Sequence, residues 1–467
     1  MTRSSATRLV SFVKAYEVRG VVGEQLTPAV ACALGWAVAR FVLDENRGRS
    51  GMSSSAVVIA HDMRESSPVL SSAFAGGVTA AGLDAVLVGL ASTDMLYFAS
   101  GMLDLPGAMF TASHNPARYN GIKLCLAGAT PISLDTGLAW VRDDAQALLG
   151  GEVHQPVVPR GVVIERSLLA EYAGYLNALV DLSEIRRLHV VVDAGNGMAG
   201  YTVPVVLGAS GLRVSELYFE LDGTFPNHEA NPIEPANLAD LQAAVRRTGA
   251  DIGLAFDGDA DRCFVVDERG DPVPPSAITG LVATRELARR PGAAALYNLI
   301  SSRAVPEIIT EAGGRPVGTR VGHSFIKAEM AATGAVFGGE HSAHYYFSSF
   351  FGADSGMLAA LHVLAALGGQ ERPLSELVAG FSRYAGSGEI NSVVADVPGK
   401  LDEIRTWAAD RGAEIDELDG VTVSLTDGRW FNVRPSNTEP LLRLNVEGQT
   451  IEAMTSLRDE ALALIRR

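Results

Sequence analysis

Residues 189–200 read HVVVDAGNGMAG, and this stretch decides the fold class. The run from His189 to Asp193 is short, apolar and rich in β-branched residues, which is typical of a buried strand. Glycines then mark a tight turn. Two further strands are predicted at 217–221 and 251–256, with helical stretches between them. Strands that alternate with helices predict βαβ units and a parallel sheet.

The same alternation continues on both sides of this stretch. Thr27-Pro28 opens a helix, with Thr as its cap and Pro in its first turn, and Ser67-Pro68 opens another. The other α/β strands are predicted at 56–61, 84–90, 107–111, 295–299, 316–320 and 335–337. The tail differs, because strands at 421–424, 430–433 and 441–446 surround tight turns before a closing helix at 451–467. The tail is therefore predicted to be α+β with an antiparallel sheet.

At about 150 residues per domain, a chain of 467 residues is expected to form several domains. The three α/β sets and the different tail predict an α/β protein of four domains. Three tandem α/β/α domains with mixed, mainly parallel sheets precede the C-terminal α+β domain. The predicted boundaries are 1–157, 158–271, 272–385 and 386–467. Ligands of open parallel sheets bind at the carboxyl ends of strands, so polar loops at equivalent strand ends predict one central cleft.

Composition restricts the possible function. Apolar residues make up 47% of the chain and charged residues 20%, which excludes disorder as the main state. A net charge of −16 argues against a nucleic-acid partner, although a locally basic cleft could still bind a small anion. No apolar run is long enough for a membrane span. Three cysteines form no disulfide framework, so we expect a cytoplasmic protein.

Two loops carry candidate catalytic groups. TASHNP at 111–116 places Ser113 beside His114 at a strand end, which suggests a nucleophile or phosphate acceptor; an ordinary capped turn is the alternative. DGDADR at 257–262 supplies three carboxylates that could converge on a hard cation, Mg²⁺ before Ca²⁺. An EF-hand is disfavoured because Arg262 stands where that loop needs Gly. Since three close carboxylates repel, Asp259→Asn is expected to cost no stability without metal.

Two later loops suggest ligand recognition. GEHSAHY at 339–345 is rich in donors and acceptors, as a sugar-hydroxyl site would be, and His323 comes from the preceding turn. The spacing of its histidines is conceivable for zinc, but no further zinc motif accompanies them, and each imidazole alone is as readily structural. RPSNTEP at 434–440 combines Arg, hydroxyls and an amide, which could clamp a phosphate; a polar hairpin turn is the alternative.

Residues 195–200 also match the G-x-G-x-x-G pattern of dinucleotide-binding proteins. Glu220 or Asp222 lies near the position of a ribose-binding acid. Glycines that allow close helix–strand packing give a simpler explanation. A dinucleotide site would also leave the other loops unexplained.

Taken together, these motifs resemble the α-D-phosphohexomutase family, specifically its phosphomannomutase/phosphoglucomutase branch. The resemblance covers almost the whole chain in order: YEVRG at 16–20, TASHNP, the D-x-G-N-G of 193–197, DGDADR, GEHSAHYYF from 339 and RPSNTEP. The chain departs from the family pattern at Glu17, at Ala343 and in NLISSR at 298–303, which lacks a common lysine. Fine substrate preference is therefore left open.

The resemblance implies a heart-like arrangement of four domains around one cleft and a phosphorylated Ser113. It implies one Mg²⁺ held by Asp257, Asp259, Asp261 and a phosphoserine oxygen. His114, Lys123 and Arg262 would act beside the transferred phosphoryl group. The implied substrate-binding residues are Tyr16, Arg19, His323, Glu340, Ser342, His344, Arg434, Ser436, Asn437 and Thr438.

The implied activity is interconversion of hexose 6-phosphate and hexose 1-phosphate, with mannose expected first and glucose second. It would proceed through a sugar 1,6-bisphosphate, which also serves as activator. Phosphoglucosamine mutase and a non-catalytic sugar-phosphate binding protein are the alternatives. The expected partners are small sugar phosphates, not nucleic acid or membrane; both monomer and dimer stay open.

Overall fold

A computed structural model of the chain describes all residues except 1–7, 49–53, 153–156 and 437–440, and omits the side chains of 46–48 and 323–324. The chain divides into two compact units. Unit one comprises Met1–Val273 with Ser342–Ser375, and unit two comprises Pro274–His341 with Glu376–Arg467.

The first sheet of unit one has the order β1-β5-β4-β2-β3-β7, with β6 paired to β5. Strands β4, β2, β3 and β7 run parallel, whereas β1 and β5 pair antiparallel at the other side. The strands are β1 Glu17–Val21, β2 Ala56–His61, β3 Asp84–Leu90, β4 Gly107–Phe110, β5 Tyr119–Leu126, β6 Thr130–Pro131 and β7 Val163–Glu165. This is a mixed, mainly parallel sheet, as predicted. Because β7 pairs with β3, the sheet also includes residues beyond 157.

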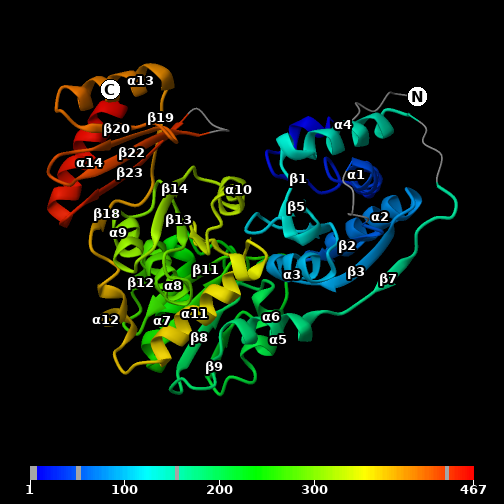
Figure 1. Ribbon diagram of the computed structural model, residues 1–467, viewed down its shortest axis with the longest axis horizontal. Coiled ribbons are helices and arrows are strands. Elements are labelled where there is room, and N and C mark those ends of the chain that lie inside the picture. Colours follow the sequence, from blue (N-terminus) through cyan, green and yellow to red (C-terminus); the bar gives the residue numbers. More distant parts are fainter. Residues whose placement is uncertain (1–7, 49–53, 153–156, 437–440) are drawn as a thin grey trace. The chain divides into compact units, whose positions relative to one another are not determined.

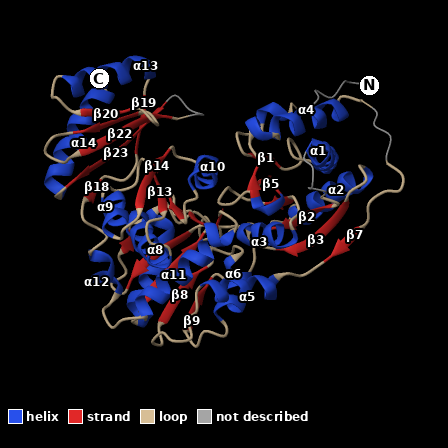
Figure 2. Ribbon diagram, in the orientation of Figure 1, coloured by secondary structure: helices blue, strands red, loops and turns tan. Residues whose placement is uncertain are grey.

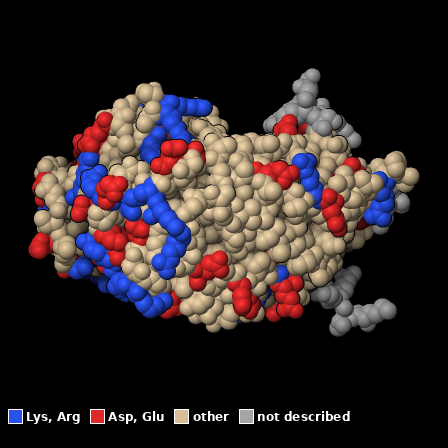
Figure 3. All heavy atoms as spheres, turned by 90° about the horizontal axis from the view of Figure 1, so that it is seen from below, with Lys and Arg blue, Asp and Glu red and all other residues tan. Residues whose placement is uncertain are grey.

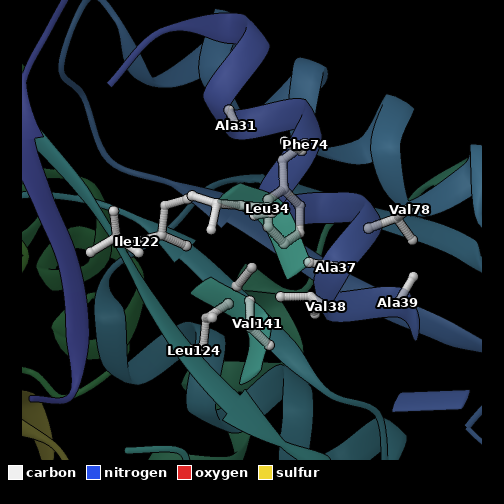
Figure 4. Close-up of a cluster of buried hydrophobic side chains, with 14 of the residues drawn as sticks. Ala31, Leu34, Ala37, Val38, Ala39, Phe74, Val78, Ile122, Leu124 and Val141 are labelled. Atoms are coloured by element: carbon white, nitrogen blue, oxygen red, sulfur yellow. The ribbon is translucent and has the colours of Figure 1, made fainter. Parts of the chain in front are cut away.

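Helices α1 to α4 flank this sheet (Figures 1 and 2). They span α1 Pro28–Gly48, α2 Ser67–Ala80, α3 Thr93–Leu103 and α4 Leu138–Leu149. Thr27 caps α1, as predicted, through its Oγ1, which accepts from the Val30 amide. The apolar face of α1 packs on the sheet, where Leu34, Phe74 and Ile122 are almost fully buried (Figure 4). This core fixes the strand ends from which the functional loops extend.

The second sheet of unit one has the order β12-β11-β10-β8-β9, in which β10, β8 and β9 are parallel. Its elements are α5 Leu169–Leu179, β8 His189–Asp193, α6 Ala199–Leu207, β9 Arg213–Leu217, α7 Ala239–Thr248, β10 Ile252–Phe256, β11 Cys263–Asp267 and β12 Pro272–Val273. The strand predicted at 217–221 is wrong: β9 ends at Leu217, because Tyr218 turns into the left-handed region with φ 57°. Later in the chain, β16 Tyr345–Phe347, β17 Ala353–Asp354 and the buried helix α11 Gly356–Gly368 complete unit one.

Unit two contains two pieces of sheet. In its α/β part, β14, β13 and β15 run parallel. Its elements are α8 Pro275–Arg289, β13 Ala294–Asn298, α9 Ala304–Glu311, β14 Arg315–Thr319, α10 His323–Thr333 and β15 Phe337–Gly339. The C-terminal part is antiparallel with the order β18-β23-β22-β21-β20, as predicted for an α+β domain. Its elements are α12 Leu374–Ala379 at the boundary, β18 Ala385–Gly386, β19 Ile390–Val393, α13 Val397–Ala409, β20 Glu414–Asp416, β21 Val421–Ser424, β22 Trp430–Pro435, β23 Leu441–Gly448 and α14 Ile451–Ile465.

Within the described part of the chain, no helix combines the length and the apolar character that a membrane span requires. On the face drawn in Figure 3, Lys and Arg side chains are interspersed with Asp and Glu.

Candidate active site

The loop that follows β4 and the loop that follows β10 meet in unit one. The Ser113 carbonyl lies so close to Gly258 that a Cβ there would collide with it, which explains the glycine between the aspartates. Ser113 itself has φ 49° and Ala260 has φ 59°, a conformation that costs most residues about 1–2 kcal/mol. Backbone strain of this kind gathers at functional sites.

The Ser113 side chain points at the first carboxylate of the acidic loop. Its Oγ donates to Asp257 Oδ2 at 2.8 Å and lies 3.2 Å from His114 Nδ1. The Ser113 amide donates to Thr111 Oγ1 at 2.9 Å, so the preceding threonine stabilises the turn. The predicted pairing of a hydroxyl with an adjacent imidazole is therefore present in space.

Three buried carboxylates form a group that could hold a metal ion. One oxygen from each of Asp257, Asp259 and Asp261 lies within 4.8 Å of the others. The Oδ1 atoms of Asp259 and Asp261 are buried and accept no hydrogen bond. Buried carboxylate oxygens need a donor or a cation. An all-oxygen donor set with two such atoms fits a hard divalent cation.

Lys123 lies between two of these aspartates. It extends from β5, and its Nζ donates to Asp259 Oδ2 at 2.7 Å and to Asp261 Oδ2 at 2.6 Å. Burial alone would lower the pKa of Lys123, but the two carboxylates raise that pKa well above its usual value. Thr93, at the start of α3, also donates to Asp259 Oδ2, at 2.6 Å. The carboxylate repulsion expected from the sequence is thus already partly offset.

Asp257, Arg262 and His114 form the other side of the group. Burial raises the pKa of Asp257 to about 7, against the lowering effect of Arg262, whose Nε donates to it at 2.8 Å. Burial and the Arg262 charge together lower the pKa of His114 to about 3, so its imidazole is neutral. Arg262 Nη2 lies 2.6 Å from His114 Nδ1, which therefore accepts and leaves the ring proton on Nε2.

The glycine-rich stretch 195–200 packs against the metal loop. The Met198 amide donates to the Gly258 carbonyl at 2.9 Å, and a Cβ on Gly197 would meet that same carbonyl. Gly200 similarly approaches the Phe219 backbone. These contacts support close packing, rather than a dinucleotide, as the reason for the glycines.

The loop that begins at Gly339 contributes residues to both units. In unit one, His344 Nδ1 lies 2.9 Å from Ser342 Oγ, and its Nε2 lies 3.6 Å from Asp261 Oδ1. In unit two, Glu340 is buried and its Oε1 accepts from the Gly322 amide at 3.2 Å. His341 is largely buried with no hydrogen bond to its Nδ1, and burial lowers the pKa of its imidazole.

The predicted phosphate loop starts at the end of β22 in unit two. Arg434 Nη2 donates to Glu389 Oε2 at 2.7 Å, and Arg443, its cross-strand neighbour on β23, donates to Glu389 Oε1 at 3.2 Å. The Ser436 amide donates to the Leu441 carbonyl. Asn437 and Thr438 lie outside the described residues, as does the side chain of His323.

The remaining candidates lie near β1. Tyr16 is half-buried immediately before the strand. Arg19 donates to Asn115 Oδ1 and, through Nη2, to Glu17 Oε2 at 2.8 Å, so the unusual Glu17 orients Arg19.

In unit two, Arg303 lies in the stretch that lacks the common lysine. It donates to the Gly428 carbonyl and is thereby tied to the C-terminal part of unit two.

Sequence reasoning missed four participants: Arg64, Thr93, Glu389 and Arg443. Arg64 donates to the Ser113 carbonyl at 2.8 Å, and Glu389 holds the two arginines. The only available signal for Arg64 was its place just after the predicted strand 56–61, because most of its acceptors are backbone atoms.

This fold and site define a four-domain phosphosugar mutase, and comparison with known proteins agrees. The models of phosphoglucomutase/phosphomannomutase α/β/α domains I, II and III match residues 11–146, 170–270 and 274–384, and that of the C-terminal domain matches 389–464. The chain belongs to the phosphoglucomutase/phosphomannomutase family.

Individual relatives match over nearly their whole length. A phosphomannomutase of Escherichia coli is 38% identical, covering 98% of this chain and 100% of the relative. A protein of Xanthomonas campestris pv. campestris named for phosphohexose mutases is 37% identical over 97% of this chain and 98% of its own. The crystal structure of a phosphoglucomutase/phosphomannomutase family protein from Burkholderia thailandensis is 33% identical, with a TM-score of 0.87 and 98% of both chains covered.

Proposed function

We propose that this protein is a phosphohexomutase that interconverts hexose 6-phosphate and hexose 1-phosphate, with mannose preferred over glucose. The observation that carries the proposal is the position of Ser113 Oγ, which donates to Asp257 Oδ2 at 2.8 Å within a buried group of charged side chains. The relatives' names support mannose as the first sugar to test.

Ser113 is proposed to carry the phosphoryl group. In the first step the P–Oγ bond breaks, a bond forms from phosphorus to O1 of a hexose 6-phosphate, and the sugar hydroxyl proton passes to Ser113 Oγ. The resulting 1,6-bisphosphate then turns, and the reverse transfer at O6 restores phosphoserine. Phosphate esters resist uncatalysed cleavage, so positioning and charge neutralisation must supply the acceleration.

Asp257, Asp259 and Asp261 would hold one Mg²⁺, which would offset negative charge on the transferred group. Arg262 and Lys123 supply fixed positive charge on this chain, and both are already held by those carboxylates. His114 is neutral, and its Nε2–H is available as a donor. These groups orient and neutralise, which is what phosphoryl transfer requires of a protein.

Recognition of the remaining substrate groups is proposed for the later loops. Glu340, Ser342 and His344 would bind sugar hydroxyls, with Tyr16, Arg19 and His323 nearby. Arg434, Ser436, Asn437 and Thr438 would bind the phosphate that is not transferred. Arg434 supports this role because its guanidinium can bind phosphate oxygens through two parallel hydrogen bonds. Three free cysteines support the cytoplasm as the compartment.

A coupled assay tests the activity. Mannose 1-phosphate, glucose 1-phosphate and glucosamine 1-phosphate are each supplied with Mg²⁺ and a trace of the matching 1,6-bisphosphate. We expect turnover fastest with mannose, and a loss of at least about 10⁴-fold in Ser113→Ala. Ser11→Ala, which removes an exposed hydroxyl of the same unit, is the control and should retain full activity. Binding of these sugars without any turnover would favour the non-catalytic alternative.

A further inference from the structure

Four backbone carbonyls of the loop around Ser113 converge on one buried side chain, Arg64. Its guanidinium has five N–H groups, and each has an acceptor. The acceptors are Asp62 Oδ2 for Nε at 3.1 Å, the Pro116 and Tyr119 carbonyls for Nη1 at 3.1 Å each, and the Ser113 and Asn115 carbonyls for Nη2 at 2.8 and 2.7 Å.

This convergence matters because the loop conformation is unfavourable by itself. Ser113 has φ 49°, which costs about 1–2 kcal/mol for a residue with a side chain. Several carbonyl oxygens pointing at one buried spot would also repel one another and lack donors. The planar guanidinium, with five donors, offsets the repulsion among these carbonyls and supplies the donors that they lack. The conformation that aims Ser113 Oγ at Asp257 therefore depends on the guanidinium.

Arg64 is itself held rigidly. Its side chain is 1% exposed, and Asp62, which is fully buried, accepts from both its amide and its Nε. The ring of Phe225 lies over the guanidinium with 5.1 Å from Cζ to the ring centroid. A Cβ on Gly223 would collide with the Arg64 Cα, so the loop at 222–225, which carries Phe225, packs directly against Arg64. The guanidinium therefore has one position available.

We propose that Arg64 is a positioning residue for phosphoryl transfer, which acts through the Ser113 loop and not on the substrate. The inference rests on the proposed function, in which Ser113 carries the phosphate. Lysine at this position would keep the charge but offer three donors from a single point, too few for five acceptors arranged around a plane. Arg64→Lys should therefore leave the loop present but loosely oriented.

The expected kinetic signature is a loss in kcat with little change in KM. Misplacement of a reacting atom by about 1 Å costs roughly 10²-fold, whereas groups that bind the sugar remain in place. We expect kcat of Arg64→Lys to fall by about 10- to 100-fold and KM to stay within about twofold.

Arg186→Lys is the matched control. Arg186 also ties segments of unit one together, through Asp251 Oδ1 at 2.9 Å and the Gln370 carbonyl at 3.1 Å, without touching the Ser113 loop. It should lose stability but keep kcat. Phe225→Leu is a second variant, for use if Arg64→Lys does not fold. It removes the ring over the guanidinium and should lower kcat in the same way as Arg64→Lys, but by a several-fold smaller factor.

Amide hydrogen exchange of the full chain supplies a readout that does not need activity. The amides of Ser113, Asn115 and Tyr119 each donate within this loop. Their exchange should accelerate at least about tenfold in Arg64→Lys or Phe225→Leu, and stay unchanged in Arg186→Lys. Equal exchange in all variants, or a kcat loss no larger than in Arg186→Lys, would overturn the proposal. An inactive wild type with this exchange pattern would overturn the mutase function while leaving the loop assignment intact.

Discussion

Two groups of charged side chains carry the proposed chemistry, and they are built in opposite ways. Around Ser113, the side chains of Asp259 and Lys123 are 0% and 11% exposed. In unit two, Arg434 and Arg443 share one carboxylate, Glu389, which is 26% exposed. Buried charges are costly to leave unpaired, whereas ion pairs that water reaches contribute less. The group proposed to carry out the transfer is thus fixed in advance, whereas the group proposed to bind phosphate shares a carboxylate that phosphate could replace.

Removing a carboxylate from the buried group should have the largest effect. Asp259→Asn is expected to lower kcat by about 10²- to 10³-fold and to remove most of the stabilisation by Mg²⁺, because it takes away a charged oxygen ligand. Thermal melts with EDTA and with Mg²⁺ measure the second effect. Asp240→Asn, on the surface of unit one, is the control. Equal Mg²⁺ stabilisation of both variants would contradict the metal assignment.

The same variant also tests how the charges are balanced. Repulsion among three carboxylates would let Asp259→Asn gain stability in EDTA, but Lys123 and Thr93 both donate to Asp259 Oδ2. Loss of these charge-assisted bonds should lower the free energy of unfolding by about 2 kcal/mol. A gain in stability would mean that repulsion dominates despite Lys123.

Asp94, which follows Thr93 in the first turn of α3, should give a pH-dependent effect on stability. It accepts from Ser92, Tyr172 and Ser355, and burial raises its pKa from 3.8 to about 6. Because the folded pKa is the higher one, its contribution is complete below about pH 4 and is lost as pH rises through 6. Denaturant unfolding should show roughly 3 kcal/mol lost by wild type between pH 4 and 7, relative to Asp94→Asn.

Asp104→Asn, on the exposed end of the same helix, should retain the wild-type pH profile. Parallel profiles of wild type and Asp94→Asn would show that the Asp94 pKa is not raised.

The partly exposed group around Glu389 should respond more weakly and in the opposite direction. Glu389→Gln removes the negative charge that would compete with phosphate for Arg434 and Arg443 while keeping an acceptor oxygen. We expect KM for the hexose phosphate to fall about threefold with kcat unchanged, a difference of under 1 kcal/mol. Glu403→Gln, which removes a surface carboxylate paired with Lys400, is the control. A higher KM would show that Glu389 orients the arginines more than it competes.

Local patterns predicted much of the fold. Strands 56–61, 84–90 and 189–193 have the predicted bounds, since each is a buried apolar run bounded by turn residues. The strand at 217–221 failed because apolar spacing does not show the left-handed turn at Tyr218. Motif loops predicted Ser113 and the acidic group. Arg64 and Glu389 were not predictable in this way, because each acts on groups that are distant in the sequence.

A single-turnover experiment shows whether Ser113 carries the transferred phosphate. Wild-type enzyme is phosphorylated by a sugar 1,6-bisphosphate that carries isotopically labelled phosphate, freed of excess bisphosphate and mixed with an equal amount of unlabelled mannose 6-phosphate and Mg²⁺. Peptide mass mapping and sugar analysis then follow the label. We expect the label to leave Ser113, to appear in mannose 1,6-bisphosphate and then at O1 of mannose 1-phosphate, while unlabelled phosphate from the substrate returns to Ser113; Ser113→Ala should take up no label. Label on another residue, or label that stays on Ser113 when mannose, glucose and glucosamine 6-phosphates are each supplied, would contradict transfer through Ser113.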